Sequence, residues 1–173
     1  AHLSGHHAVD SPKPQPLPCG CPGSAMRSFT AVPSCPDTSS AEASVSQLSH
    51  WPVQMALVPS HAPFLRNADI LVSADCAPFA IPDFHSRFLG GRAVLVGCPK
   101  LDDISYYREK LNDVFSTANP KSITVLRMEV PCCGGLARAV TDARNAIIPG
   151  TPLEIVTVGI HGDIIRETVP SPV

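Results

Sequence analysis

Four short apolar runs, each separated from the next by a segment of helical periodicity, constrain the fold of this chain most strongly. The runs are rich in β-branched residues and nearly continuous, as parallel strands buried on both faces are: DILVSA (69–74), RAVLVG (92–97), SITVLRME (122–129) and LEIVTVGI (153–160). Helical stripes cover residues 81–88, 104–115 and 136–147, and Asp102 or Asp103 suits the N-cap of the second. With VQMALV (53–58) as a further strand, the pattern predicts a three-layer α/β fold, in which about five mostly parallel strands carry helices on both faces.

The first 50 residues differ in composition from the rest of the chain. Residues 1–50 are rich in Pro, Ser, Ala and His, and they hold too few large apolar side chains to offset the entropy lost on ordering. We therefore expect an extended linker or arm over 1–50, which carries the cysteine loop CGCPG (19–23), and an α/β domain over 51–173. Because the opening residue is Ala rather than Met, the chain could be a fragment of a longer protein.

Charge and hydropathy exclude several classes of partner. The net charge is -2 and no run of Lys or Arg occurs, which argues against nucleic acid and against an anionic membrane surface. No apolar stretch approaches the ~20 residues that cross a bilayer, and the chain does not open like a secretion signal. We expect a cytoplasmic protein, for which a homo-oligomer is compatible with the sequence.

Cysteines follow three of the predicted strands. Cys76 comes after the run at 69–74, Cys98 after the run at 92–97, and Cys132 and Cys133 after the run at 122–129. The carboxyl ends of parallel strands share one edge of a sheet, with neighbouring strands ~4.8 Å apart, so these thiols converge if the strands are neighbours. Together with the pair that flanks Gly20, they give six candidate ligands: Cys19, Cys21, Cys76, Cys98, Cys132 and Cys133. Cys35 lies in a polar stretch without nearby glycine and is left out.

The surroundings of these cysteines favour an iron–sulfur cluster over zinc. Nearby glycines let the backbone approach sulfur closely, helix starts favour thiolate, and no CxxC pair typical of zinc sites occurs. A 4Fe-4S cluster needs four thiolates, so six candidates leave a larger cluster or two clusters open. A zinc-stabilised interaction domain is the alternative, and a thiol–disulfide enzyme using Cys132 and Cys133 is a weaker one. His161 follows the last run and could ligate or relay a proton, whereas no glycine-rich phosphate loop follows any strand.

Several longer motifs resemble a family of anaerobe ferredoxin-type 4Fe-4S binding proteins. In order they are CGCPGSAMRSF (19–29), SQLSHWPVQMALV (46–58), ADC-x-x-FA (74–80), GCPKLDD (97–103) and MEVPCCGG (128–135), and the likeness covers roughly residues 18–167. Members of that family begin with a two-cluster ferredoxin module of C-x2-C-x2-C-x3-C-P runs, which this chain lacks. The resemblance implies iron–sulfur binding and electron transfer in anaerobic metabolism. It also implies a ferredoxin-type electron donor or acceptor, either as a separate partner or as the missing N-terminal module.

Overall fold

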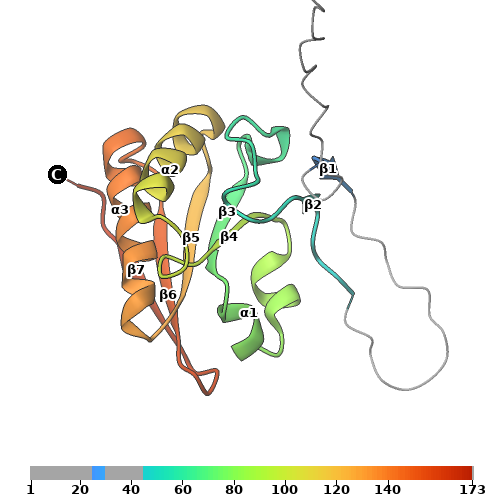
Figure 1. Ribbon diagram of the computed structural model, residues 1–173, viewed down its shortest axis with the longest axis vertical. Coiled ribbons are helices and arrows are strands. Elements are labelled where there is room, and N and C mark those ends of the chain that lie inside the picture. Colours follow the sequence, from blue (N-terminus) through green and yellow to red (C-terminus); the bar gives the residue numbers. More distant parts are fainter. Residues whose placement is uncertain (1–24, 30–44, 173) are drawn as a thin grey trace, which may run out of the picture.

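A five-stranded sheet is the centre of the computed structural model, which describes residues 25–29 and 45–172 (Figure 1). Its strands lie in the order β4-β3-β5-β6-β7, and all are parallel except the last, which runs antiparallel to β6. Their bounds are β3 (Asp69–Ala74), β4 (Arg92–Gly97), β5 (Ser122–Met128), β6 (Leu153–Val158) and β7 (Ile164–Val169). The mostly parallel α/β sheet predicted from the apolar runs is thereby confirmed.

The prediction of a strand at 53–58 is wrong, and the sequence analysis missed the strand that is the fifth of the sheet. Gln54 forms only an isolated parallel bridge with Val96, after which the chain turns because the N–H groups of Leu57 and Val58 both donate to the carbonyl of Gln54. The fifth strand is β7. Its side chains are mostly exposed and include Arg166 and Glu167, so it carries no continuous apolar run.

Two long helices pack side by side on one face of the sheet (Figure 1). They are α2 (Ile104–Ala118) and α3 (Gly134–Ile147), as the stripes predict, and Asp103 caps α2 by accepting a hydrogen bond from the Ser105 N–H at 2.8 Å. No continuous helix covers 81–88: a π-helical turn at His85–Leu89 lies in this range, and the short helix α1 (Ala77–Ala80) precedes it. No helix in the part of the chain described here is long and apolar enough to span a membrane.

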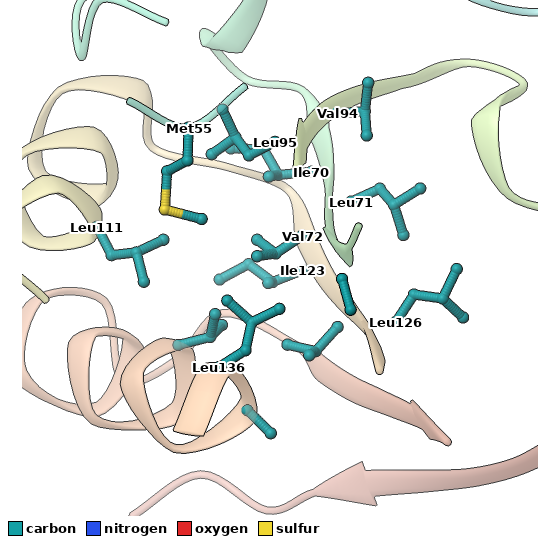
Figure 2. Packing of buried hydrophobic residues seen from close by; sticks show 14 of the residues in the cluster. Met55, Ile70, Leu71, Val72, Val94, Leu95, Leu111, Ile123, Leu126 and Leu136 are labelled. Carbon is teal, nitrogen blue, oxygen red and sulfur yellow. The ribbon is translucent and has the colours of Figure 1, made fainter. Parts of the chain in front are cut away.

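The core lies on both faces of the central strands. Figure 2 shows Leu111 of α2 and Leu136 of α3 on the same side as Val72 and Ile123, with Met55 beside Leu111, and all five are at most 1% exposed. Alternate strand residues point the other way, among them Leu71, Val94 and Leu126. At about 1.5–3 kcal/mol for each large apolar side chain removed from water, this packing is the main source of stability.

A short N-terminal ribbon is attached to the outer edge of β4. It consists of β1 (Arg27–Ser28) paired antiparallel with β2 (His50–Trp51). His50 is fully buried, its Nε2 accepts a hydrogen bond from the Val94 N–H at 2.8 Å, and its ring stacks on Phe64 at 4.0 Å. Residues 1–24 of the predicted arm, with the CGCPG loop, and residues 30–44 lie outside the described residues.

Candidate functional site

The strand order places the cysteine-bearing loops next to one another. β3 lies between β4 and β5, so the loops that begin after Ala74, Gly97 and Met128 leave the sheet at adjacent positions on its carboxyl edge. The chain passes from β3 to β4 on one side and then crosses to β5 on the other side. Such a reversal of strand order opens a crevice at the carboxyl ends, which is where open α/β sheets bind their ligands.

Cys133 lies at the centre of this edge. It ends the 3-10 turn Pro131–Cys133 that leads into α3, and it is 5% exposed. Burial raises the pKa of the Cys133 thiol and a hydrogen bond with the Met128 backbone lowers it, while the neighbouring Cys132 and Cys98 thiols raise the pKa further. Two further predicted ligands, Cys98 and Cys132, therefore lie close enough to Cys133 to act on its thiol.

The other cysteines of the described chain differ in exposure. Cys76 is exposed at the start of α1, Cys132 is exposed and Cys98 is half-buried, and none of these or Cys133 forms a disulfide. Cys76 shares the carboxyl edge because β3 is the middle strand of the three. Cys19 and Cys21 lie outside the described residues, as does Cys35.

A buried tyrosine holds the Cys98 loop. The Tyr107 hydroxyl accepts a hydrogen bond from the Cys98 N–H at 3.1 Å and donates one to the Asp102 carboxylate. Burial raises the pKa of Tyr107 far above its usual value, and the hydrogen bond to Asp102 and the charge of Asp75 add to this, so the phenol stays protonated. A methyl group on Gly97 would collide with the phenol, so glycine is required where the tyrosine crosses β4.

Sequence reasoning missed Tyr107 as a site residue. It falls in the helical stripe of 104–115 and reads there as an ordinary core residue. The stripe predicts its burial correctly, but which backbone group its hydroxyl reaches depends on how α2 crosses the end of β4. The sequence suggests Asp102 or Asp103 as the cap of this helix, and Asp103 takes that role, whereas Asp102 accepts the hydrogen bond from Tyr107.

The turn at 159–163, which follows β6, is the fourth loop at the carboxyl edge, and it contacts the segments after β5 and β3. The Glu129 carboxylate accepts a hydrogen bond from the Ile160 N–H at 2.9 Å, which ties this turn to the end of β5. A Cβ on Gly162 would lie 2.9 Å from the Ala80 carbonyl oxygen, so the turn also touches α1. His161 is exposed in this turn, on the edge where the sequence predicts it.

The part of the chain that the structure describes does not contain an assembled metal site. Within residues 25–29 and 45–172, no group of three or more His, Cys, Asp or Glu side chains is arranged to hold a metal ion. The donor chemistry at the edge, thiols beside a glycine-containing helix start, nevertheless suits iron or zinc bound by thiolates. A set of four thiolate ligands would need Cys76, or Cys19 and Cys21, in addition to Cys98, Cys132 and Cys133.

The charge of the carboxyl edge is unfavourable for phosphate groups. The four loops at this edge, residues 75–80, 98–103, 129–135 and 159–163, contain five carboxylates and one lysine, which gives a formal charge of 1 − 5 = −4 with His161 neutral. These residues are Asp75, Asp102, Asp103, Glu129, Asp163 and Lys100. The loop after β3 also lacks the glycines that let a pyrophosphate approach the backbone. Dinucleotide binding of the usual α/β kind does not fit this edge.

A hollow at the opposite end of the sheet is a weaker candidate site. It has a volume of about 280 Å³ and is lined by residues at the amino ends of the parallel strands, including Arg92, Thr124 and Glu154. Its charged groups already have partners, since Arg92 donates to the Phe88 carbonyl at 2.9 Å and Glu154 pairs with Arg166 at 2.9 Å. Little polar chemistry remains there for a ligand.

Comparison with known proteins identifies the fold but assigns no activity. A family model described as a Rossmann-like domain matches residues 62–171. An uncharacterized protein of Archaeoglobus fulgidus is 33% identical to this chain over 120 residues, which cover 69% of this chain and 84% of that protein. No solved structure matches.

These findings correct the family resemblance drawn from the cysteine motifs. Assignment to a ferredoxin-type 4Fe-4S binding family is wrong, because the family model that matches is a Rossmann-like domain and the relative has no assigned function. The motifs that suggested it lie at strand ends, for instance GCPKLDD after β4 and MEVPCCGG after β5. Cluster binding is therefore inferred only from the side chains at the carboxyl edge of this sheet.

Proposed function

This chain belongs to the Rossmann-like domain family, and we propose that it uses the carboxyl edge of its sheet to bind an iron–sulfur cluster through cysteine thiolates. One observation supports the proposal above the others: three adjacent strands, β4, β3 and β5, are each followed by a cysteine at the same edge. The crevice at a reversal of strand order is the usual ligand position in such sheets. In this chain thiols, rather than phosphate-binding glycines, lie there.

The proposed ligands are Cys98, Cys132 and Cys133, which interact, with Cys76 on the neighbouring strand and Cys19 and Cys21 from the N-terminal segment. A bound cluster would supply one-electron redox chemistry, and 4Fe-4S is the expected form because four thiolates suffice for it. Gly134 and Gly135 open α3 directly after Cys133, so the positive end of this 14-residue helix lies beside the thiols and would stabilise the negative charge of a thiolate-bound cluster. The protein would exchange electrons with a ferredoxin-type carrier in the cytoplasm.

Metal analysis of cysteine variants tests this proposal. We expect anaerobically purified protein to contain iron and acid-labile sulfide, and the variants Cys98→Ser and Cys132→Ser to lose both together. Cys35→Ser is the matched control, because Cys35 is not a proposed ligand and its replacement should leave both contents unchanged. Serine keeps the size of the side chain, so circular dichroism can confirm that each variant is folded.

Zinc is the alternative that this experiment separates from iron. Stoichiometric zinc without labile sulfide, together with unfolding by a chelator, would show a zinc-stabilised domain instead. A folded, colourless protein with neither metal nor sulfide would contradict both. In that case the interacting Cys132 and Cys133 thiols would point to thiol–disulfide chemistry.

A further inference from the structure

Three large apolar side chains stand out from the loops around the thiols. Phe79 is 92% exposed, Leu101 is 81% exposed and Ile160 is 61% exposed, and each belongs to a different loop of the carboxyl edge. Leaving such side chains in water is unfavourable, and exposed apolar groups gathered at one place mark interaction sites. Cys76 and Cys132 are exposed on the same edge.

The segments that carry these side chains are linked by contacts. The turn at 159–163 touches α1 where Gly162 meets the Ala80 carbonyl, and it is tied to β5 by the hydrogen bond from Ile160 to Glu129. On the other side, Pro99 lies 3.4 Å from the position that a Cβ on Gly135 would take. The loop of Leu101 is therefore packed against the start of α3. The three apolar side chains are carried by linked segments, residues 75–80, 98–103, 129–135 and 159–163, which form the rim of the carboxyl edge.

The charge of this rim selects the kind of partner. Asp102, Asp103, Glu129 and Asp163 are exposed there, against the single exposed Lys100. A second copy of the chain would bring the same carboxylates against them, and like charges at an interface are repelled. A protein with Lys or Arg around an apolar centre would be attracted instead.

We infer that the carboxyl edge, with Phe79, Leu101 and Ile160 at its apolar positions, is the docking surface for an electron-transfer protein that presents a cationic rim around its redox group. The choice of an electron-transfer partner rests on the proposed cluster function, whereas the docking surface itself does not. A ferredoxin-type carrier would fit only if its contact face were basic. Docking here would bring the redox group of the partner next to the exposed thiols.

Binding measurements with two probes of opposite charge test this inference. We would titrate the full chain, both metal-free and iron-loaded, with a small basic c-type cytochrome and with a small acidic plant-type ferredoxin, using isothermal titration calorimetry. The basic probe should bind, its affinity should fall as ionic strength rises, and the acidic probe should not bind. NMR shifts on binding should cluster in residues 75–80, 98–103 and 159–163.

Surface variants provide the matched comparison. The double variant Phe79→Ser/Leu101→Ser should weaken binding of the basic probe by about tenfold or more, because exposed apolar side chains become the buried centre of the interface. Ile147→Ser should leave affinity unchanged, since Ile147 is 38% exposed in the last turn of α3, at the end of the helix opposite to the carboxyl edge. Circular dichroism of each variant shows whether it is folded, so that a loss of binding can be assigned to the docking surface rather than to unfolding.

Several results would overturn the inference. These are equal binding of the acidic probe, unchanged affinity in the double variant, and a dimer of the full chain that this variant converts to a monomer. A cross-link between Lys13 and Lys100 would also overturn it, because the N-terminal segment of the chain would then cover the edge. If the metal-free protein binds the basic probe but no iron is ever found, docking stands and the proposed cluster falls. If iron is present and no probe binds, the cluster stands and docking falls.

Discussion

A single backbone N–H, that of Cys98, is held by a tyrosine from the next helix. The Tyr107 hydroxyl accepts from it at 3.1 Å and donates a hydrogen bond to the Asp102 carboxylate, while the Leu101 and Asp102 N–H groups donate to the Cys98 carbonyl. The loop is thus closed on itself before any ligand arrives. This pre-organisation would let the Cys98 thiol face Cys133 without a further loss of entropy on binding.

Removing the Tyr107 hydroxyl tests this arrangement. We expect Tyr107→Phe to lower the free energy of unfolding by about 1–2 kcal/mol, because the Cys98 N–H loses its best-placed acceptor. The Cys98 thiol should also react faster with an alkylating reagent, which mass spectrometry can follow. Tyr106→Phe is the control, since the Tyr106 hydroxyl makes only a 3.4 Å contact with the Ala56 carbonyl at the surface. Equal effects of the two variants would contradict the role of Tyr107.

Only part of this arrangement around Cys98 can be predicted from the sequence. The position of Cys98 just after an apolar run follows from strand patterning alone, and so does its place on the carboxyl edge. The contact of Tyr107 with that loop does not, because helical periodicity predicts which face is buried but not what a buried hydroxyl meets.

Among the elements, the N-terminal ribbon is joined to the sheet by a neutral histidine. His50 Nε2 accepts from the Val94 N–H, so the proton lies on Nδ1, which donates to the Pro52 carbonyl at 3.1 Å. Burial lowers the pKa of His50, and the hydrogen bond to Pro52 offsets part of that effect. A second proton would have to occupy the nitrogen that accepts from β4.

This histidine predicts a dependence of stability on pH. Because the pKa is lower in the folded state than its unfolded value of about 6.5, the contribution is fully present above that pH and is lost as the pH falls below it. Urea unfolding between pH 7.5 and 5 should show a smaller pH slope in His50→Gln than in the unmodified protein. His61→Gln, at an exposed position, should keep the original slope. An unchanged slope in His50→Gln would disprove the assignment.

The last strand is tied to α3 by a buried arginine. Arg144 is fully buried and donates to the carbonyls of Pro149, Val169 and Pro170 at 3.0–3.2 Å, although its Nε has no partner among the described atoms. We expect Arg144→Met to cost about 2–3 kcal/mol of the free energy of unfolding, since carbonyls at the end of β7 lose charged donors. Arg138→Met, exposed on the same helix, should change it by less than about 0.5 kcal/mol. Urea titration measures both, and equal losses would show that Arg144 has no special role.

The predictability of the elements follows from how each is buried. β3, β4, β5 and β6 and the long helices were predicted from sequence because they pack into the core and keep its periodicity. β7 was not predicted, because a surface strand with exposed side chains has no apolar run in its sequence. The segment at 53–58 was wrongly predicted as a strand because Val53, Met55 and Val58 are apolar. They lie in a turn that packs against β4, and such a turn buries apolar side chains without forming a strand.

At the scale of the whole molecule, a common fold carries an unusual set of side chains at the carboxyl edge of its sheet. The reversal of strand order at β3 and β5 is where proteins of this architecture bind ligands, and here the position holds cysteines and carboxylates instead of phosphate-binding glycines. The sequence predicts the shared edge from right-handed crossovers but not the strand order, because that order depends on which side each crossover takes. It likewise cannot reveal the apolar rim, since Phe79 and Leu101 look like core residues until their exposure is known.

An EPR spectrum of the anaerobically purified full chain, recorded oxidised and reduced and read with the iron count, tests the central claim most directly. We predict a signal of a cysteine-bound cluster in one of the two states, with labile sulfide matching the iron, and loss of that signal in Cys98→Ser. A spectrum without any cluster signal in either state, from a folded protein whose iron and sulfide are both absent, would contradict the account.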